Sequence, residues 1–447
     1  MTFQTFKLNE RVIDGVVKAG YVTPTPIQTK AIPPVMDGRD VMGLAQTGTG
    51  KTAAFVLPML HRFLDGPSKR VRALIIAPTR ELAEQIHESI ETLGRQTGVR
   101  SISIYGGVGI NPQIQKLRQG PAIVVACPGR LLDHLGRGTV DLSNLEMLVI
   151  DEADQMFDMG FFPDIRRILG HVPKQRQTLF FSATMPDPIH LLAKDVLRDP
   201  VTIRIGIQAP ADTVSHALYP VAQHLKTALL MKLLGQTDTN SVLVFTRTKH
   251  RAKMLDRKLT AAGYEAASLQ GNLSQNRRQA ALSGFKEGRV RILVATDIAA
   301  RGIDVTRVSH VINYDVPSTP EAYIHRIGRT GRASETGEAF TLVTGDDGDM
   351  VRAIDRVLGT RVERRQLADF DYGLPDTRST QNASPRAAVN ASRGNGRSSS
   401  SQANGKPKTF SHSRNAAHGT ASRPTSTSRQ KRRPQRWGES TAVRSAA

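Results

Sequence analysis

The strongest constraint on the fold is a repeated alternation between short apolar runs rich in β-branched residues and longer amphipathic stretches. In the first half of the chain, the apolar runs lie at 72–77, 101–105, 122–126, 145–150 and 177–182. Amphipathic segments separate them, and in residues 80–93 the apolar side chains recur at intervals of three and four. Repeated strand–helix–strand units predict parallel sheets that are covered by helices on both faces.

A second series of apolar runs begins near residue 214. Its clearest members lie at 241–246, 290–296, 308–314 and 338–344. The stretch 206–213 (GIQAPADT) contains Gly and Pro without periodicity, which is typical of a linker. We therefore expect an α/β protein whose domains span residues 1–205 and 214–372, joined by the linker 206–213 and followed by a tail at 373–447.

The charge of the chain indicates a polyanionic partner. Its 447 residues include 61 Lys or Arg against 40 Asp or Glu, a formal net charge of +21, and such a surplus is typical of nucleic-acid binding. The last 73 residues hold 14 of these basic residues and only 2 acidic ones. Because this tail has few large apolar residues, we expect it to be disordered. It either tethers RNA through its basic clusters or only keeps the chain soluble.

Three classes of protein are excluded early. No apolar run approaches the ~18–20 residues that a membrane-spanning helix needs, and the first residues do not read as a secretory signal. Cys127 is the single cysteine, which excludes a disulfide framework and a cysteine-based zinc site. A reducing, cytoplasmic location is therefore expected.

A phosphate-binding loop is predicted at AQTGTGKT, residues 45–52, between an apolar run and an apolar helix. Its glycines, Gly48 and Gly50, let successive backbone N–H groups face a phosphate, while Lys51 can reach the β and γ phosphates and Thr52 can hold Mg²⁺. The predicted ATP-binding residues of this loop are Ala45, Gln46, Thr47, Gly48, Thr49, Gly50, Lys51 and Thr52.

An acidic segment that ends a strand is the expected partner of such a loop, and LVIDEAD at 148–154 provides one. Asp151 is the predicted Mg²⁺ ligand, acting through water. Glu152 is the predicted general base that polarises the attacking water.

These motifs, together with four others in order, resemble the DEAD-box ATP-dependent RNA helicases of superfamily 2. The others are GYVTPTPIQ (20–28, with Phe3 upstream), SAT (182–184), VATDIAARGID (294–304) and YIHRIGRTGRA (323–333). The resemblance runs from Phe3 to about residue 372 and implies two RecA-like domains in tandem. Among bacterial subgroups, YGGVGINPQIQKL and the short basic tail are most similar to the RhlE-like enzymes.

The resemblance also implies roles for individual residues. Gln28 would read the adenine edge, Tyr21 would stack on the ring and Asp304 would bind the ribose. Arg329 and Arg332 would act as arginine fingers on the γ phosphate, and His325 would contact the DEAD segment near Asp154. Coupling of nucleotide state to strand separation would involve Asp154, Ser182 and Thr184, with Ser182 and Asp154 as the expected pair.

RNA contacts follow from the same resemblance. The expected residues come mostly after strands and carry hydroxyl, backbone N–H or guanidinium groups, which suit phosphate and sugar rather than base edges. They are Thr79, Arg80, Gly107, Gly129, Arg130, Thr246, Arg247, Thr296 and Gly302. Two positions depart from the family pattern: Cys127 replaces a Thr, and Gln270 stands where His is frequent.

The predicted activity is ATP hydrolysis, with Mg²⁺, coupled to binding and local unwinding of short RNA duplexes, largely independent of RNA sequence. A ribosomal precursor or an RNA-degradation complex is a possible partner. Two alternatives stay open at this point. One is a DNA-directed ATPase of the same superfamily, and the other is an RNA chaperone or annealing protein that relies on its basic tail.

Overall fold

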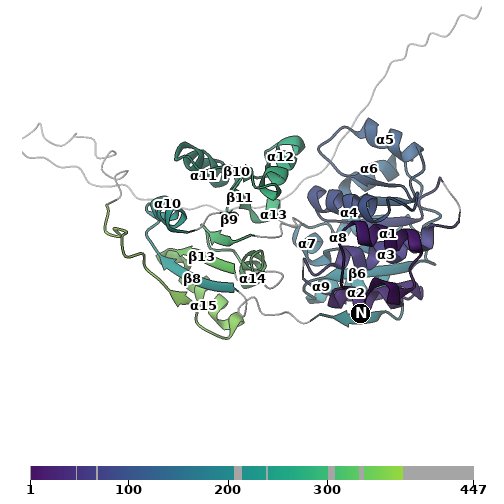
Figure 1. Ribbon diagram of the computed structural model, residues 1–447, viewed down its shortest axis with the longest axis horizontal. Coiled ribbons are helices and arrows are strands. Elements are labelled where there is room, and N and C mark those ends of the chain that lie inside the picture. Colours follow the sequence, from purple (N-terminus) through teal and green to yellow (C-terminus); the bar gives the residue numbers. More distant parts are fainter. Residues whose placement is uncertain are drawn as a thin grey trace, which may run out of the picture. The chain divides into compact units, whose positions relative to one another are not determined.

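The structure is a computed structural model that describes residues 2–46, 48–66, 69–205, 214–237, 240–300, 308–331 and 337–375. Within these ranges the chain forms two parallel sheets of seven strands each, one in the first half of the chain and one in the second (Figure 1). The predicted linker 206–213 and the basic tail from residue 376 lie outside the described residues.

The first domain contains strands β1 to β7. They are Val41–Leu44 (β1), Ala73–Ile76 (β2), Ser101–Ile104 (β3), Ile123–Ala126 (β4), Met147–Ile150 (β5), Gln177–Ser182 (β6) and Val201–Arg204 (β7). A 3₁₀ helix, η1 (Phe3–Phe6), precedes its helices, which are Glu10–Lys18 (α1), Pro26–Met36 (α2), Lys51–Phe63 (α3), Arg80–Leu93 (α4), Ile110–Arg118 (α5), Pro128–Gly136 (α6), Ala153–Asp158 (α7), Phe162–Leu169 (α8) and Asp187–Val196 (α9).

The second domain contains strands β8 to β14. They are Val214–Pro220 (β8), Val242–Thr246 (β9), Ala266–Leu269 (β10), Ile292–Thr296 (β11), His310–Asn313 (β12), Gly337–Val343 (β13) and Glu363–Arg364 (β14). Its helices are Lys226–Gln236 (α10), Lys249–Ala261 (α11), Gln275–Lys286 (α12), Asp297–Ala300 (α13), Pro320–Ile327 (α14), η3 (Gly345–Asp347) and Gly348–Leu358 (α15).

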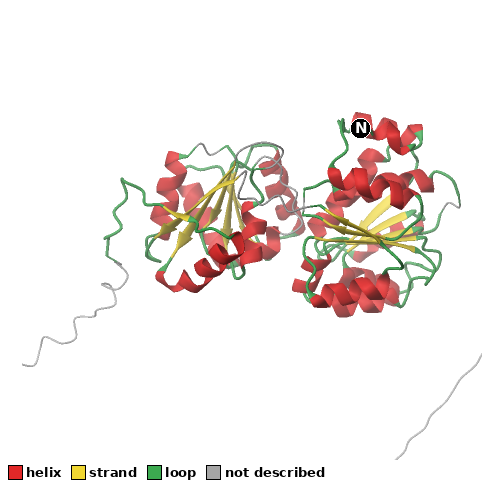
Figure 2. Cartoon of the chain, turned by 90° about the horizontal axis from the view of Figure 1, so that it is seen from below, coloured by secondary structure: helices red, strands yellow, loops and turns green. Residues whose placement is uncertain are grey.

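Each sheet lies between helices on both of its faces, as Figure 2 shows. Successive side chains of a strand point to opposite faces, so each sheet separates two apolar layers. On β2, Ala73 and Ile75 pack in one layer with α3 and α4, whereas Leu74 and Ile76 pack in the other with α8 and α9. Burial on both faces explains why the strands read as continuous apolar runs. The predicted α/β fold with two parallel-sheet domains is confirmed.

The strand order divides the edge of the first sheet at which the strands end, and which carries the predicted functional segments, into two halves. The order is β3-β4-β2-β5-β6-β1-β7, and all its pairings are parallel. The segments that follow β5, β6 and β1 are the DEAD segment, SAT and the phosphate-binding loop, so adjacent strands deliver them. The segments that follow β3, β4 and β2 carry the RNA contacts predicted for this domain and form the other half of the edge.

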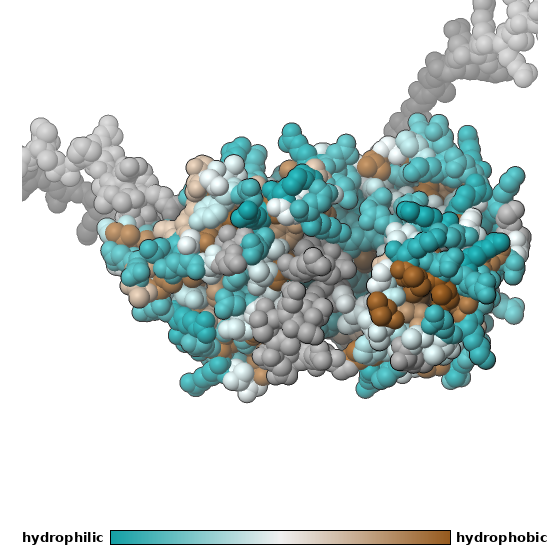
Figure 3. Space-filling view, viewed as in Figure 1, coloured by the Kyte–Doolittle hydropathy of each residue, from teal (hydrophilic) through white to brown (hydrophobic). Residues whose placement is uncertain are grey.

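Helices of the described residues are all too short or too polar to cross a membrane. The face of the molecule in Figure 3 is mostly hydrophilic, with apolar surface gathered on one part of it. Among the large apolar side chains that stay exposed are Val17 and Val22, which lie at and just beyond the end of α1.

Candidate active site

The phosphate-binding loop connects β1 to α3 with a glycine in a left-handed conformation. Gly50 has φ of +92° and precedes Lys51, the first residue of α3. A Cβ atom at Gly50 would lie only 2.5 Å from Nε2 of Gln28, so a larger residue would displace the Gln28 amide as well as strain the backbone. The hydroxyl of Thr49 donates to the Gln46 carbonyl at 2.8 Å and tightens the turn. Thr47 lies outside the described residues.

Gln28 ties helix α2 to this loop. Its side chain is buried, its Oε1 accepts from the Thr25 N–H at 2.9 Å, and its Nε2 donates to the Gly50 carbonyl at 3.1 Å. One N–H and one lone pair of the amide remain for another partner. Tyr21 is part-exposed, and its ring meets Phe3 edge-on with 6.0 Å between centroids. Phe3 therefore supports the ring that the resemblance assigns to adenine stacking.

Lys51 and the acidic segment meet at the end of β5. The Lys51 Nζ donates to the Ala45 carbonyl at 2.9 Å and lies 4.0 Å from Oδ1 of Asp151. Asp151 in turn accepts from the backbone N–H of Glu152 at 3.0 Å. Lys51, Asp151 and Glu152 are all buried, and burying charges is unfavourable unless they are paired. The three groups therefore form one electrostatic unit.

Glu152 is held in an unusual state. Its backbone is left-handed, with φ of +53°, which costs a non-glycine residue roughly 1–3 kcal/mol. Its Oε2 atom is buried and has no hydrogen-bond partner among the described residues. Burial raises the pKa of the carboxyl to about 8, although Lys51 opposes this shift. Strain together with an unsatisfied acceptor indicates a reactive group rather than a packing residue.

The SAT segment contacts the DEAD segment, although not through the expected pair. Oδ2 of Asp154 accepts from the backbone N–H groups of Ala183 and Thr184 at 3.1 and 3.0 Å. The hydroxyl of Ser182 instead donates to the Thr184 carbonyl at 2.7 Å. The predicted pairing of Ser182 with Asp154 is therefore wrong, because the backbone beyond β6 satisfies the carboxylate.

The other half of the sheet edge brings together the segments after β2, β3 and β4. Thr79 is the N-cap of α4 and accepts from the Leu82 N–H at 3.2 Å. The guanidinium of Arg80 covers Gly107, where a Cβ atom would lie 2.0 Å from Nη1. A pocket is bordered in this domain by Thr79, Arg80, Gly106, Gly129 and Arg130.

Arg130 has a partner that the sequence did not indicate. Its Nη1 and Nη2 both donate to the Val108 carbonyl, at 3.2 and 3.1 Å. Arg130 therefore holds the loop after β3 and is not simply a solvated cation awaiting RNA. Cys127, directly before this segment, is partly buried, and desolvation raises the pKa of its thiol to about 12, so the thiol is neutral.

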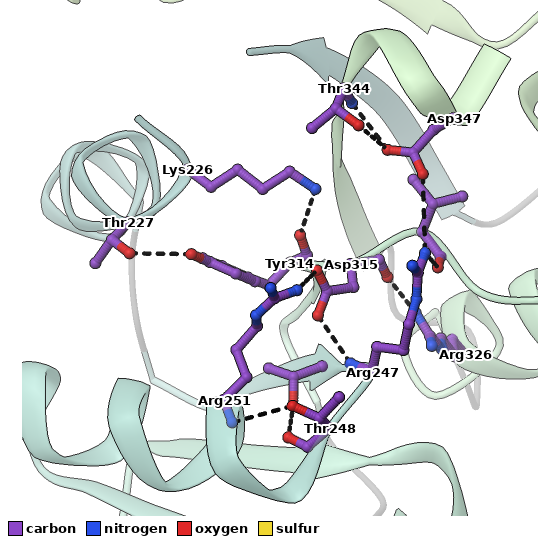
Figure 4. A network of polar contacts seen from close by, with 12 residues as sticks. Lys226, Thr227, Arg247, Thr248, Arg251, Tyr314, Asp315, Arg326, Thr344 and Asp347 are labelled. Carbon is purple, nitrogen blue, oxygen red and sulfur yellow. Dashed lines mark hydrogen bonds and ion pairs between the residues drawn. The ribbon is translucent and has the colours of Figure 1, made fainter. Parts of the chain in front are cut away.

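In the second domain, Asp315 organises the segments after β9 and β12 (Figure 4). Its carboxylate accepts from the Arg247 N–H at 2.8 Å and from the Arg251 guanidinium at 2.5 Å. Its backbone carbonyl accepts from Nη1 of Arg326 at 2.7 Å. The Arg247 side chain is mostly exposed and lies 3.8 Å from Asp347. Thr246, at the end of β9, is fully buried.

Arg326 is a residue that the sequence reasoning missed. It is buried on α14 and pairs with both oxygens of Asp297, at 2.6 and 2.7 Å. This pair joins α14 to the segment that follows Thr296 at the end of β11. A short YIHRIGR motif alone does not distinguish this buried arginine from Arg329, which is also buried and follows α14. His325 lies on the same helix, while Arg332, Gly302 and Asp304 lie outside the described residues.

Gln270 follows β10 and is buried. Its Oε1 accepts from the Asn272 N–H at 2.7 Å and so shapes its own turn.

The raised pKa of Glu152 predicts how stability depends on pH. Native Glu152 keeps its proton up to about pH 8, whereas the unfolded chain releases it near its ordinary value of about 4.3. Unfolding therefore releases a proton between these limits, and stability falls as the pH rises through them. Without nucleotide, the melting temperature of the wild type should fall relative to that of Glu152→Gln as the pH rises from about 4.3 to about 8. If the melting temperatures of the wild type and Glu152→Gln changed in parallel with pH, the raised pKa of Glu152 would be contradicted.

Comparisons with known proteins agree with this geometry. The family model described as DEAD/DEAH box helicase matches residues 25–192, and the model described as helicase conserved C-terminal domain matches residues 225–334. The chain is 45% identical over 370 residues to the ATP-dependent RNA helicase CshA of Listeria monocytogenes, covering 83% of this chain and 71% of the relative. It is 43% identical to the DEAD-box ATP-dependent RNA helicase CshA of Geobacillus kaustophilus, covering 83% and 80%.

A solved structure resembles both domains of the chain. S. cerevisiae Dbp5 bound to RNA and ADP BeF3 has a TM-score of 0.71 and 32% identity, covering 81% of this chain and 95% of that chain. The relatives carry the name CshA, so the RhlE-like subgroup stays a prediction. The DNA-directed and non-catalytic alternatives are not favoured. The phosphate-binding loop, the buried acidic pair and these relatives together show that the chain belongs to the DEAD-box family of ATP-dependent RNA helicases.

Proposed function

We propose that Glu152 is the general base for ATP hydrolysis in this helicase. The observation that supports this role is its buried carboxylate, with one oxygen lacking a partner among the described residues, beside Lys51 and Asp151. A carboxyl accepts a proton only when it is ionised, and in the proposed site the positive charge of Lys51 would favour that form against the burial that raises the pKa of Glu152. The attacking water would donate a hydrogen bond to Oε2.

ATP would occupy the loop that links β1 to α3. Lys51 now donates to the Ala45 carbonyl, so phosphate binding would replace that weak neutral acceptor with a charged one. Gln28 would use its remaining N–H and lone pair for the adenine edge, and Tyr21 would stack on the ring. The same amide holds Gly50, so adenine recognition would also stabilise the phosphate loop.

The donor set beside this loop fits Mg²⁺. Thr52 and Asp151 provide the hydroxyl and carboxylate oxygens that this hard cation prefers, and the burial of Asp151 leaves its charge poorly compensated by Lys51 at 4.0 Å. When bound, the ion would neutralise charge on the β and γ phosphate oxygens.

The second domain would complete the site when the domains close on ATP and RNA. Arg329 and Arg332 would stabilise the charge of the transferring phosphoryl group, an effect worth about 10³–10⁵ in rate in other nucleotide hydrolases. Arg326, through its pair with Asp297, would hold α14 in position. Asp304 would bind the ribose, and His325 would contact the DEAD segment.

RNA would lie along the edge formed by the segments after β2, β3 and β4 and by those after β9 and β11. The predicted contacts to phosphate and sugar are Thr79, Arg80, Gly107, Gly129, Arg130, Thr246, Arg247, Thr296 and Gly302. Contacts to 2′-OH groups would favour RNA over DNA. Closure would bend one strand and open a few base pairs of a short duplex, without long-range translocation. The cellular RNA, a ribosomal precursor or an RNA-degradation complex, and the cytoplasmic location remain predictions.

Glu152→Gln should lower kcat for RNA-stimulated ATP hydrolysis by roughly 10²–10⁴. The KM for ATP should change little, because the amide keeps the shape of the carboxylate and the phosphate loop is untouched. The matched control is Glu91→Gln, which changes an exposed glutamate of α4 and should leave kcat unchanged. Hydrolysis by Glu152→Gln at the wild-type rate would rule out Glu152 as the base.

Deleting residues 375–447 should weaken RNA binding and flatten its salt dependence. For single strands, every phosphate that the protein neutralises adds about 0.7 to the steepness of log K against log[salt], and the tail holds 14 basic residues. ATP hydrolysis at saturating RNA should persist. If affinity and slope both stayed at wild-type values, the tail would not tether RNA.

A further inference from the structure

The loop at 105–109 connects β3 to α5 and contains the predicted RNA contact Gly107. Side chains from two helices hold three of its carbonyl groups. Arg130 of α6 donates twice to the Val108 carbonyl. Gln113 of α5 donates through one Nε2 to the carbonyls of Tyr105, at 3.1 Å, and Gly109, at 3.4 Å. Gln113 therefore joins the two ends of the loop.

His134 fixes the orientation of the Gln113 amide. Only the NH₂ group of the amide can donate hydrogen bonds to the two carbonyls. The Oε1 atom therefore faces His134, whose Nε2 lies 3.3 Å away. The His134 Nε2 therefore carries hydrogen, and its Nδ1 competes with the His134 carbonyl, at 2.8 and 3.1 Å, for the single hydrogen of the Thr139 hydroxyl. His134 is fully buried, and burial lowers its pKa, which keeps the ring neutral.

His134 follows Arg130 by four residues, so both side chains extend from one face of α6. One reaches the Val108 carbonyl directly and the other reaches the loop through Gln113. The sequence places Gln113 and His134 21 residues apart, yet the parallel pairing of β3 with β4 brings their helices together.

Fixing the carbonyl groups of this loop also fixes the directions of the N–H groups in the same peptides. In a trans peptide, the C=O of one residue and the N–H of the next point in opposite directions. Holding the carbonyls of Tyr105 and Val108 inward therefore turns the N–H groups of Gly106 and Gly109 outward. Neither group, nor the N–H of Gly107, donates a hydrogen bond to any described residue. Gly107 has φ of +80°, the left-handed conformation found in backbone concavities that bind anions through their N–H groups.

We propose that Gln113, oriented by His134, is a positioning residue that aims the backbone N–H groups of the 105–109 loop at an RNA phosphate. This inference rests on the proposed RNA path, and it adds a role for two side chains that touch no RNA themselves. Their effect should therefore appear in RNA affinity and not in nucleotide binding.

The test compares two buried glutamines in the full chain. Gln113→Leu should raise the RNA concentration for half-maximal stimulation of ATP hydrolysis about tenfold, as expected when a buried hydrogen-bonded group is removed. Its affinity for ADP should stay at the wild-type value. Gln177→Leu is the matched control, because Gln177 also donates to two carbonyls, of Val35 at 3.0 Å and Arg39 at 2.7 Å. Gln177 is the first residue of β6 and so lies at the end of the strands opposite the edge that carries the loops. The Gln177→Leu variant should therefore respond to RNA as the wild type does.

A second pair of variants tests the same role if Gln113→Leu does not fold. His134→Leu should weaken RNA stimulation in the same way, whereas His87→Leu should not, since buried His87 of α4 contacts Ser101 at the start of β3. The positioning role is overturned if each variant shifts the RNA response no more than its control. If RNA failed to stimulate the wild type at all, the proposed function itself would be overturned.

Discussion

Parallel strands all end at the same edge of a sheet, and this constraint makes the site possible. The loops after β1, β5 and β6 come from residues far apart in the chain, yet strand order makes them neighbours. The loops after β2, β3 and β4 occupy the rest of the edge. One sheet thus separates a phosphate-binding half from a half suited to RNA, and the DEAD segment lies after β5, next to their boundary. Binding of a ligand at one half could therefore affect the other half through the DEAD segment.

Buried charge gives the edge its reactivity. Lys51, Asp151 and Glu152 are removed from water without full mutual compensation, and one oxygen of Glu152 has no partner among the described residues. Such a cluster costs stability, and the positive φ of Glu152 adds to that cost. In the proposed site, a nucleotide and its metal ion would supply the missing partners. Asp154 differs, because its carboxylate already accepts hydrogen bonds from the backbone beyond β6.

The sequence predicts elements well where burial alone decides them. The runs at β2, β4 and β9 are rich in Val and Ile and are buried on both faces, so their apolar character is visible. Strand β10 (AASL) lacks that character, so a search for β-branched apolar runs does not find it. Contacts made by backbone groups also escape the sequence: Asp154 pairs with N–H groups beyond Ser182, and Arg130 with the Val108 carbonyl. No residue pattern encodes these, because any side chain brings the same N–H and C=O groups.

Coupling between RNA binding and ATP hydrolysis is the central claim, and steady-state hydrolysis at one fixed salt concentration tests it most directly. The full chain is compared without nucleic acid, with single-stranded RNA, and with DNA of the same length and sequence. The account predicts strong stimulation by RNA and little by DNA, because in the proposed mechanism RNA binding would close the domains and complete the site. Equal stimulation by DNA, or none by either polymer, would contradict it.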